Sequence, residues 1–214
     1  MWLGVGGIVG PALFVLAVLT SGFLRRDYSP IHQVISDLGI GNDSWIVDGA
    51  CVLTGLLLSA FNIAFFLSLK GALANPLRWL CAILLELSPI GLAVAGIFTE
   101  EPATLAIHWM VGAALGLYGP LIAFLVVGLL LRRHPGLKGW ARLSLVMWGA
   151  TLVLDGVMMW GFTPGSSLAA FYLGGLLERL AIAAILCWYF VSGCRLVGRG
   201  TERIAADGHV WHDA

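Results

Sequence analysis

The chain has 214 residues, of which 59% are apolar and only 11% are charged, and its formal net charge is zero. Soluble domains average about 45–50% apolar and about 25% charged residues, so this composition excludes a disordered chain and a soluble enzyme with an ordinary surface. The balanced charge also provides no basic surface for nucleic acid, and the sequence predicts a chain that folds within a lipid bilayer.

Six apolar stretches are each long enough to cross a bilayer, whose hydrocarbon core requires roughly 20 apolar residues per helix. They cover residues 2–24, 46–69, 78–98, 106–131, 140–162 and 168–194. None of them shows the two-residue alternation of a barrel strand. The sequence therefore predicts an all-α bundle of six transmembrane helices forming one domain over residues 1–195, followed by a flexible tail at 196–214.

Between the first two stretches, the outer loop contains a short amphipathic pattern. Ser29 can cap a helix that has Pro30 at its first position, and apolar residues then recur at the helical spacing Ile31, Val34, Ile35 and Leu38. We expect a short helix that lies in the membrane interface and ends at Gly39. The opposite face carries His32, Gln33, Ser36 and Asp37. It either meets water or directs His32 and Asp37 toward the bundle.

The distribution of Lys and Arg predicts the orientation of the bundle. Only Arg25 and Arg26 lie in the first, third and fifth loops, whereas the second and fourth loops and the tail contain most of the basic residues. Because cytoplasmic loops carry the excess of Lys and Arg, both termini are expected in the cytoplasm, with the protein in the plasma or inner membrane. The outer loops are acidic and include Glu100 and Glu101.

Tryptophan and glycine positions suggest how the helices meet lipid and each other. Tryptophans at the predicted helix ends are expected to form an interfacial belt. They are Trp2, Trp45, Trp79, Trp109, Trp140, Trp160 and Trp188. The pairs Gly6/Gly10 and Gly112/Gly116 have the small-xxx-small spacing that lets helices approach closely, within the chain or in a homo-oligomer.

Four ionisable residues lie inside the predicted spans: Glu86, Asp155, Glu178 and Arg179. Each strong case costs roughly 2.5–3.5 kcal/mol at a helix centre, so these groups must be paired, neutralised or placed in a wet cavity. Asp155, Glu178 and Arg179 lie roughly 10–17 Å from the outer helix ends at 1.5 Å per residue, whereas Glu86 lies in the inner half. Two interpretations remain open, namely a buried ion pair such as Arg179 with Asp155, or a polar pocket facing the outer leaflet.

Pro89 adds a local feature beside Glu86. Proline has no N–H to donate to the residue four positions earlier, so the carbonyl of Leu85 is freed within the span. A kink next to an intramembrane carboxylate is a mild indication of function.

Three segments together resemble a family of bacterial and archaeal membrane proteins catalogued as domain of unknown function 998. They are Tyr28-Ser29-Pro30 with Ile35-Ser36-Asp37-Leu38-Gly39, Gly96-Ile97-Phe98 before the acidic loop and His108, and Leu177-Glu178-Arg179-Leu180. The resemblance extends over nearly the whole chain up to about residue 195. It implies a six-span bundle in which Ser36, Asp37, His108, Glu178 and Arg179 belong to one pattern, and it implies no activity.

The leading functional hypothesis is an outer-leaflet pocket for a membrane lipid or an isoprenoid-like molecule. Asp37, His108 and Glu178 would act as acid or base, and Arg179 would bind an anionic head group or tune Glu178. Further candidate binding residues are Asp155, His32, Ser36, Tyr28 and Trp148. No cofactor is expected, and no metal, because the outer-side histidines lack the spacing of a zinc site.

Two other classes remain open. A small proton-coupled permease would use intramembrane carboxylates as a relay, with Glu86 as the inner-side group. A non-catalytic accessory or scaffold protein would use Glu178 and Arg179 only to hold its helices together.

Overall fold

The computed structural model describes residues 2–167 and 169–209. Within these residues six helical segments are long and apolar enough to cross a membrane, which confirms the six-span all-α fold. Four of the spans are built around α1 (Gly6–Leu24), α2 (Ser44–Ser68), α3 (Asn75–Ile97) and α6 (Lys138–Phe162). The fourth span consists of α4 (Leu105–Ile107), η3 (His108–Tyr118) and α5 (Gly119–Leu131), and the sixth is α7 (Gly174–His209). Short 3-10 turns η1 (Trp2–Val5) and η4 (Pro135–Leu137) precede α1 and α6.

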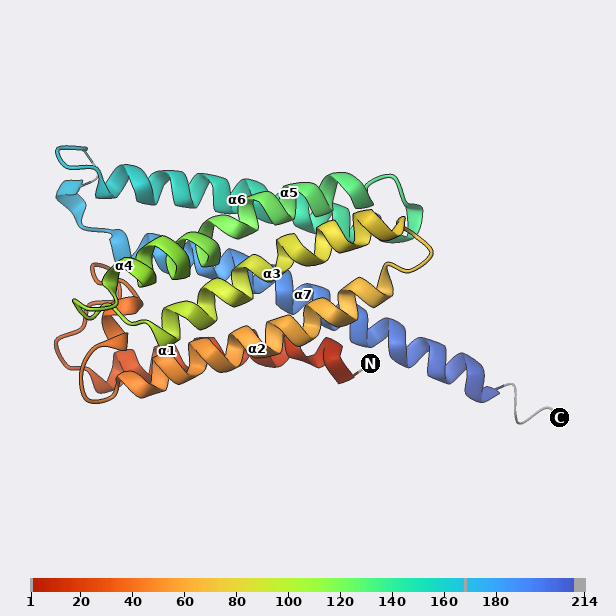
Figure 1. The fold of residues 1–214 in the computed structure, drawn as a ribbon, viewed down its shortest axis with the longest axis horizontal. Coiled ribbons are helices and arrows are strands. Elements are labelled where there is room, and N and C mark those ends of the chain that lie inside the picture. The colour runs from red at the N-terminus through yellow and green to blue at the C-terminus, as the bar shows by residue number, and fades with distance from the viewer. Residues whose placement is uncertain (1, 168, 210–214) are drawn as a thin grey trace.

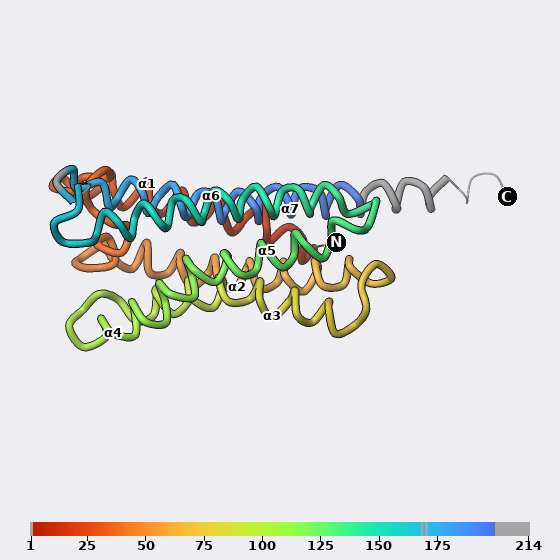
Figure 2. The backbone as a smooth tube through the Cα atoms, turned by 90° about the horizontal axis from the view of Figure 1, so that it is seen from above, coloured from red at the N-terminus to blue at the C-terminus, as the bar shows by residue number. Residues whose placement is uncertain are grey.

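The helices run up and down in one bundle (Figure 1). Neighbouring helices contact in the order α1, α2, α3, fourth span, α6 and α7, and α7 returns to α1, so the bundle closes on itself. The first, third and fifth loops gather at one end, here called the odd-loop end, and the N-terminus lies toward the other (Figure 1). Figure 2 shows α1, α6 and α7 on one side of the bundle, with α2 and α3 on the other.

The last span differs most from the predicted boundaries. A 3-10 turn, η5 (Ala169–Phe171), and Tyr172 with a positive φ of 49° precede it, so α7 begins at Gly174 rather than near residue 168. The same helix continues to His209. Residues 210–214 of the predicted tail lie outside the described residues.

Two prolines inside spans free carbonyls that other helices satisfy. The Leu85 carbonyl, which lacks a donor because of Pro89, accepts a 2.9 Å hydrogen bond from the Tyr189 hydroxyl. The Gly116 carbonyl, whose α-helical donor would be the missing N–H of Pro120, accepts a 3.1 Å bond from Ser88. Gly116 belongs to η3, where the helix widens into eleven residues of π-helix, a form often associated with functional sites.

Close packing of α3 on η3 requires small residues. A Cβ on Gly91 would lie 2.2 Å from the backbone nitrogen of Gly116, a distance that no real Cβ adopts. The two glycine pairs noted in the sequence are also used inside the chain: Gly6 packs against α2 and Gly112 against α3. Both faces are therefore occupied by helices of the same molecule.

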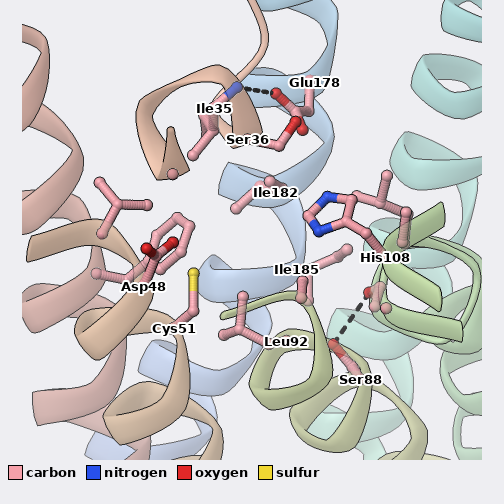
Figure 3. A pocket seen from close by; sticks show the side chains of 18 of the residues that line it. Ile35, Ser36, Asp48, Cys51, Ser88, Leu92, His108, Glu178, Ile182 and Ile185 are labelled. Atoms are coloured by element: carbon pink, nitrogen blue, oxygen red, sulfur yellow. Dashed lines mark hydrogen bonds between the residues drawn. The ribbon is translucent and has the colours of Figure 1, made fainter. Parts of the chain in front are cut away.

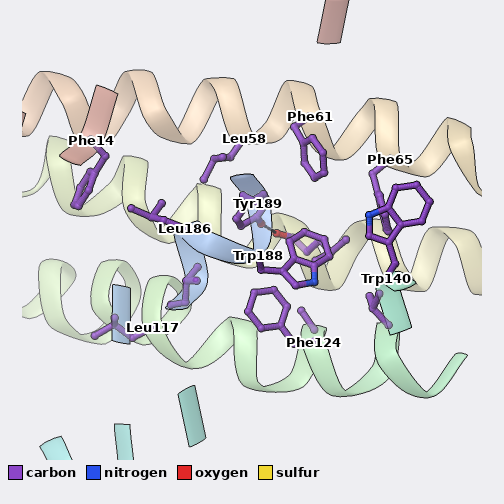
Figure 4. Close-up of a cluster of buried hydrophobic side chains, with 14 of the residues drawn as sticks. Phe14, Leu58, Phe61, Phe65, Leu117, Phe124, Trp140, Leu186, Trp188 and Tyr189 are labelled. Atoms are coloured by element: carbon purple, nitrogen blue, oxygen red, sulfur yellow. Dashed lines mark hydrogen bonds between the residues drawn. The ribbon is translucent and has the colours of Figure 1, made fainter. Parts of the chain in front are cut away.

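An aromatic cluster fills the bundle away from the odd-loop end (Figure 4). The rings of Phe61, Phe65, Trp188 and Tyr189 pack edge-to-face or stacked at centroid distances of 5.1–6.1 Å. Trp188 is fully buried, and its indole N–H donates to Ser144 at 2.8 Å. Trp140 is also buried. The prediction that Trp140 and Trp188 belong to an interfacial belt is therefore wrong, because both rings fill the core. The other five tryptophans of the predicted belt are exposed.

The first outer loop is less helical than its apolar pattern predicts. Its regular structure is one 3-10 turn, η2 (Ser36–Gly39), preceded by turns. Ile35 and Leu38 are buried as an apolar face should be, whereas Ile31 is 48% exposed. Three backbone groups that a longer helix could pair internally, those of Ile31, Gln33 and Ile35, instead hydrogen-bond to α7.

Candidate functional site

A cavity at the odd-loop end is enclosed by α1, α2, α3, η3, α7 and the first outer loop. It contains about 810 Å³ of space, including its open mouth. Figure 3 shows Asp48 and Cys51 of α2 facing this space from one side and His108 of η3 from another. Glu178, Ile182 and Ile185 of α7 also line the cavity.

The lining changes from polar to apolar with depth. Most polar side chains that face the cavity lie within about one turn of the odd-loop ends of their helices or in the adjoining loops: Ser36, Asp48, Thr99, His108 and Glu178. The deeper wall is formed mostly by apolar side chains, including Leu58, Leu117 and Leu186. At 1.5 Å per residue, Leu58 lies about 21 Å along α2 from its first residue. The cavity thus has a polar mouth and a long apolar interior.

His108 is held in one orientation at the mouth. It is buried, and its Nδ1 lies 2.8 Å from the carbonyl oxygen of Phe98. Because a carbonyl only accepts hydrogen bonds, the proton of a neutral ring is assigned to Nδ1. Nε2 is 3.6 Å from an oxygen of Glu100, which also accepts a 2.8 Å bond from Ser36. Nε2 therefore carries the lone pair of the neutral ring, and none of the described residues hydrogen-bonds to it.

Glu178 and Arg179 both hold the first outer loop against α7. One oxygen of buried Glu178 accepts a hydrogen bond from the backbone N–H of Ile35. Arg179 donates to the carbonyl of Gln33 at 2.8 Å and to the hydroxyl of Tyr28. Among the described residues neither side chain forms an ion pair, so the predicted pair of Arg179 with Asp155 is not formed.

Gly175 permits this contact between loop and helix. A Cβ at this position would lie 2.1 Å from the carbonyl oxygen of Gln33. The next residue, Leu176, donates its N–H to the carbonyl of Ile31 at 3.0 Å. Part of the loop backbone therefore bonds to α7 rather than to itself, which limits the predicted amphipathic helix to one turn.

Tyr28 anchors the start of the same loop. It is buried, and its hydroxyl donates to the carbonyl of Val34 at 2.7 Å. Burial raises the pKa of Tyr28 above its ordinary value of 10.0, although the hydrogen bond from Arg179 opposes the shift. Docking of the loop therefore favours the protonated phenol.

Three of the candidate residues from the sequence meet at the cavity: Ser36, His108 and Glu178. The others lie elsewhere. Arg179 and Tyr28 bind the loop, and His32 is exposed with its Nδ1 2.8 Å from the carbonyl of Tyr172. The catalytic and binding roles assigned to these residues remain predictions.

Asp37 and the two candidates on α6 do not line the cavity. Asp37 is half-buried, and its carbonyl accepts a hydrogen bond from Arg25. Trp148 is half-buried, and Asp155 is 3% exposed. Neither carboxylate oxygen of Asp155 has a hydrogen-bond partner among the described residues.

The sequence reasoning missed several lining residues, among them Asp48, Cys51, Ser88 and Thr99. In the sequence Asp48 is one of several acidic residues in and near the outer loops, so its charge alone does not distinguish it. Its spacing to Cys51 and Leu58 places all three on one face of α2, which is a signal that could have identified it. Within the described residues, no group of three His, Cys, Asp or Glu side chains could hold a metal ion.

Glu86, the fourth ionisable residue predicted inside a span, lies outside this cavity. Its carboxylate accepts a 2.8 Å hydrogen bond from the amide of Asn62. Both residues line a separate groove between α2 and α3.

Comparison with known proteins gives one match. A family model described as a protein of unknown function (DUF998) matches residues 8–195. No curated protein and no solved structure is significantly similar to the chain.

Proposed function

The chain belongs to the DUF998 family, and we propose that its cavity binds a membrane amphiphile, a lipid or an isoprenoid-like molecule, which His108 and Glu178 can then act on as acid and base. The observation that supports this most directly is the change of the cavity lining from polar at the mouth to apolar in the interior. A molecule with a polar head and an apolar chain matches that gradient.

The orientation belongs to the same proposal. The Lys and Arg distribution favours cytoplasmic termini, which places the odd-loop end at the outer face of the cell membrane. The cavity mouth then faces the outer leaflet, and its ligand would enter from there.

Acid–base chemistry is supported by the setting of His108. Its ring is fixed by Phe98, and Nε2 is not used in a hydrogen bond among the described residues, although Glu100 lies nearby. Such a nitrogen can accept a proton from a head group, and Glu100 stabilises the resulting charge. Glu178 provides a second proton-transfer group on the facing helix.

A proton-coupled carrier is less compatible with the packing below the cavity. Transport requires a polar route to the opposite end of the bundle. The aromatic cluster around Trp188, Phe61 and Phe124 occupies the region beyond Leu186, and all of these rings are buried. Glu86 lies in a separate groove lined by apolar side chains and Asn62.

Native mass spectrometry of the gently extracted protein tests the binding proposal. We expect a bound lipid that Ile182→Trp displaces, because Ile182 lines the cavity. Leu180→Trp is the matched control, since Leu180 lies on the same helix and is 44% exposed. A parent protein without bound lipid, or equal retention in both variants, would overturn the proposal.

The lipid found bound to the protein can also be used to test the proposed acid–base reaction. Its conversion by the purified protein should slow by about 100-fold in His108→Gln, with binding retained. His134→Gln, in the loop before η4, is the control for a histidine outside the cavity. If the parent does not convert the molecule, the acid–base part of the proposal fails while the binding part stands.

A further inference from the structure

The charged side chains that line the cavity are carboxylates. Asp48 and Glu178 contribute acidic groups, and His108 is the only basic side chain among the lining residues that the structure describes. No Lys or Arg from the described chain lines this space. A head group that enters the cavity therefore meets negative charge.

Two arginines close in sequence to residues of the cavity, Arg25 and Arg179, do not line it. Arg179 uses its guanidinium on Gln33, Gly175 and Tyr28. Arg25 donates to the carbonyls of Asp37 and Ile40. The anionic head group expected for Arg179 therefore has no arginine to bind at the mouth.

Glu178 retains hydrogen-bonding capacity that the protein does not use. It is 9% exposed, and only one of its oxygens accepts a hydrogen bond, from Ile35. The second oxygen has no hydrogen bond from the described residues, and it is not sealed from the cavity that Glu178 lines. An acceptor held in this way is complementary to a donor carried by the ligand.

Building on the proposed function, we propose that the ligand is a single-chain amphiphile with a primary ammonium head group, which donates to the free oxygen of Glu178 while Asp48 adds a second negative charge to the cavity lining. The two carboxylates come from different helices, α2 and α7, and both face the cavity (Figure 3). An ammonium carries three donors and no acceptor, whereas a phosphate would be repelled by both acids. One chain suits the space, because a single apolar interior leads inward from the polar residues.

The test compares dodecylamine, dodecanol and dodecyl phosphate binding to the full-length protein in nanodiscs. We expect the amine to bind about tenfold or more tightly than the alcohol, as one charge-assisted hydrogen bond allows, and the phosphate to bind weakest. Glu178→Gln and Asp48→Asn should each reduce the preference for the amine to about threefold or less, with binding of the alcohol unchanged. Asp43→Asn is the matched control, because Asp43 is exposed outside this cavity.

The outcomes separate the two proposals. If the alcohol or the phosphate binds as well as the amine, and Ile182→Trp still abolishes binding, the ammonium inference is overturned and the cavity remains a lipid site. If Ile182→Trp changes the binding of none of the three probes, both proposals fail. Glu178→Gln can still accept the Ile35 hydrogen bond, and Asp48→Asn tests the inference without touching the loop contact.

Discussion

Replacing Gly175 with alanine should detach the first outer loop from α7. The new Cβ would lie 2.1 Å from the carbonyl oxygen of Gln33 and 2.8 Å from that of Pro30. Both clashes are with backbone, so a side-chain rotation cannot relieve them. The loop must move away, and the hydrogen bonds that it makes with the first turns of α7 are weakened together.

The size of the effect follows from those hydrogen bonds. The contacts of Ile35 with Glu178 and of Gln33 with Arg179 are each charge-assisted, and such bonds contribute about 1.5–3 kcal/mol. The bond from Leu176 to Ile31 contributes about 1 kcal/mol. We expect loop docking to lose about 4–7 kcal/mol if all three bonds break. The helix preference of alanine over glycine offsets only about 1 kcal/mol.

Hydrogen exchange of the Ile35 and Leu176 amides measures this loss directly. Exchange should accelerate by about 100-fold or more in Gly175→Ala, since 1.4 kcal/mol corresponds to a factor of ten. Gly156→Ala is the matched control, because a Cβ there meets nothing within 4 Å and should stabilise α6 by about 1 kcal/mol. Equal protection of the loop amides in the two variants would refute the argument.

Three further predictions concern single side chains. Tyr189→Phe should lower the free energy of unfolding by about 1–3 kcal/mol because the Leu85 carbonyl loses its donor, and this cost should shrink in a Pro89→Ala background, where a backbone N–H is restored. Asp155→Asn should raise the midpoint of thermal unfolding by the equivalent of about 1–3 kcal/mol, because it removes a buried carboxylate without partners among the described residues. The protection of the loop amides against hydrogen exchange should be constant below pH 10, which is the ordinary pKa of a tyrosine phenol. It should fall as pH rises through the higher pKa that Tyr28 has in the docked loop.

Each of these has a clear contrary result. An undiminished cost of Tyr189→Phe in the Pro89→Ala background would mean that the hydroxyl does not serve the freed carbonyl. Lower stability of Asp155→Asn would mean that the carboxylate makes a favourable interaction. Tyr28→Phe should abolish the loss of loop protection above pH 10, and a loss that persists in this variant would assign it to another group.

The lengths of the apolar segments were sufficient to predict the fold, but not the position of every tryptophan side chain. A bilayer imposes about 20 apolar residues per span, and the six spans follow from that requirement alone. Trp140 and Trp188 were misplaced because an indole near a helix end suits either the interface or a neighbouring helix. Which of these applies depends on helix rotation, and that is set by packing across the bundle.

The sequence also predicted only part of the candidate site, including His108 and Glu178 but not Asp48. Glu178 stands out because charged groups are costly in a membrane, whereas His108 stands out as an outer-side histidine in a segment that resembles the family. Asp48 lies only four residues after the start of α2, where an acid needs no special explanation. The first loop was misread because its apolar spacing identifies Ile35 and Leu38 as buried. That spacing carries no information on whether the backbone pairs with itself or with α7.

The contact between the first loop and α7 joins the two ends of the membrane domain. Ile35 and Glu178 are separated by 143 positions, and Tyr28 and Arg179 by 151. During synthesis the loop emerges long before the sixth span. Its hydrogen bonds with Glu178 and Arg179 can therefore form only after that last helix has inserted. The polar end of the cavity is consequently completed by the final step of assembly. A chain that stops after five spans contains the loop but lacks the two side chains, Glu178 and Arg179, that hold it against α7.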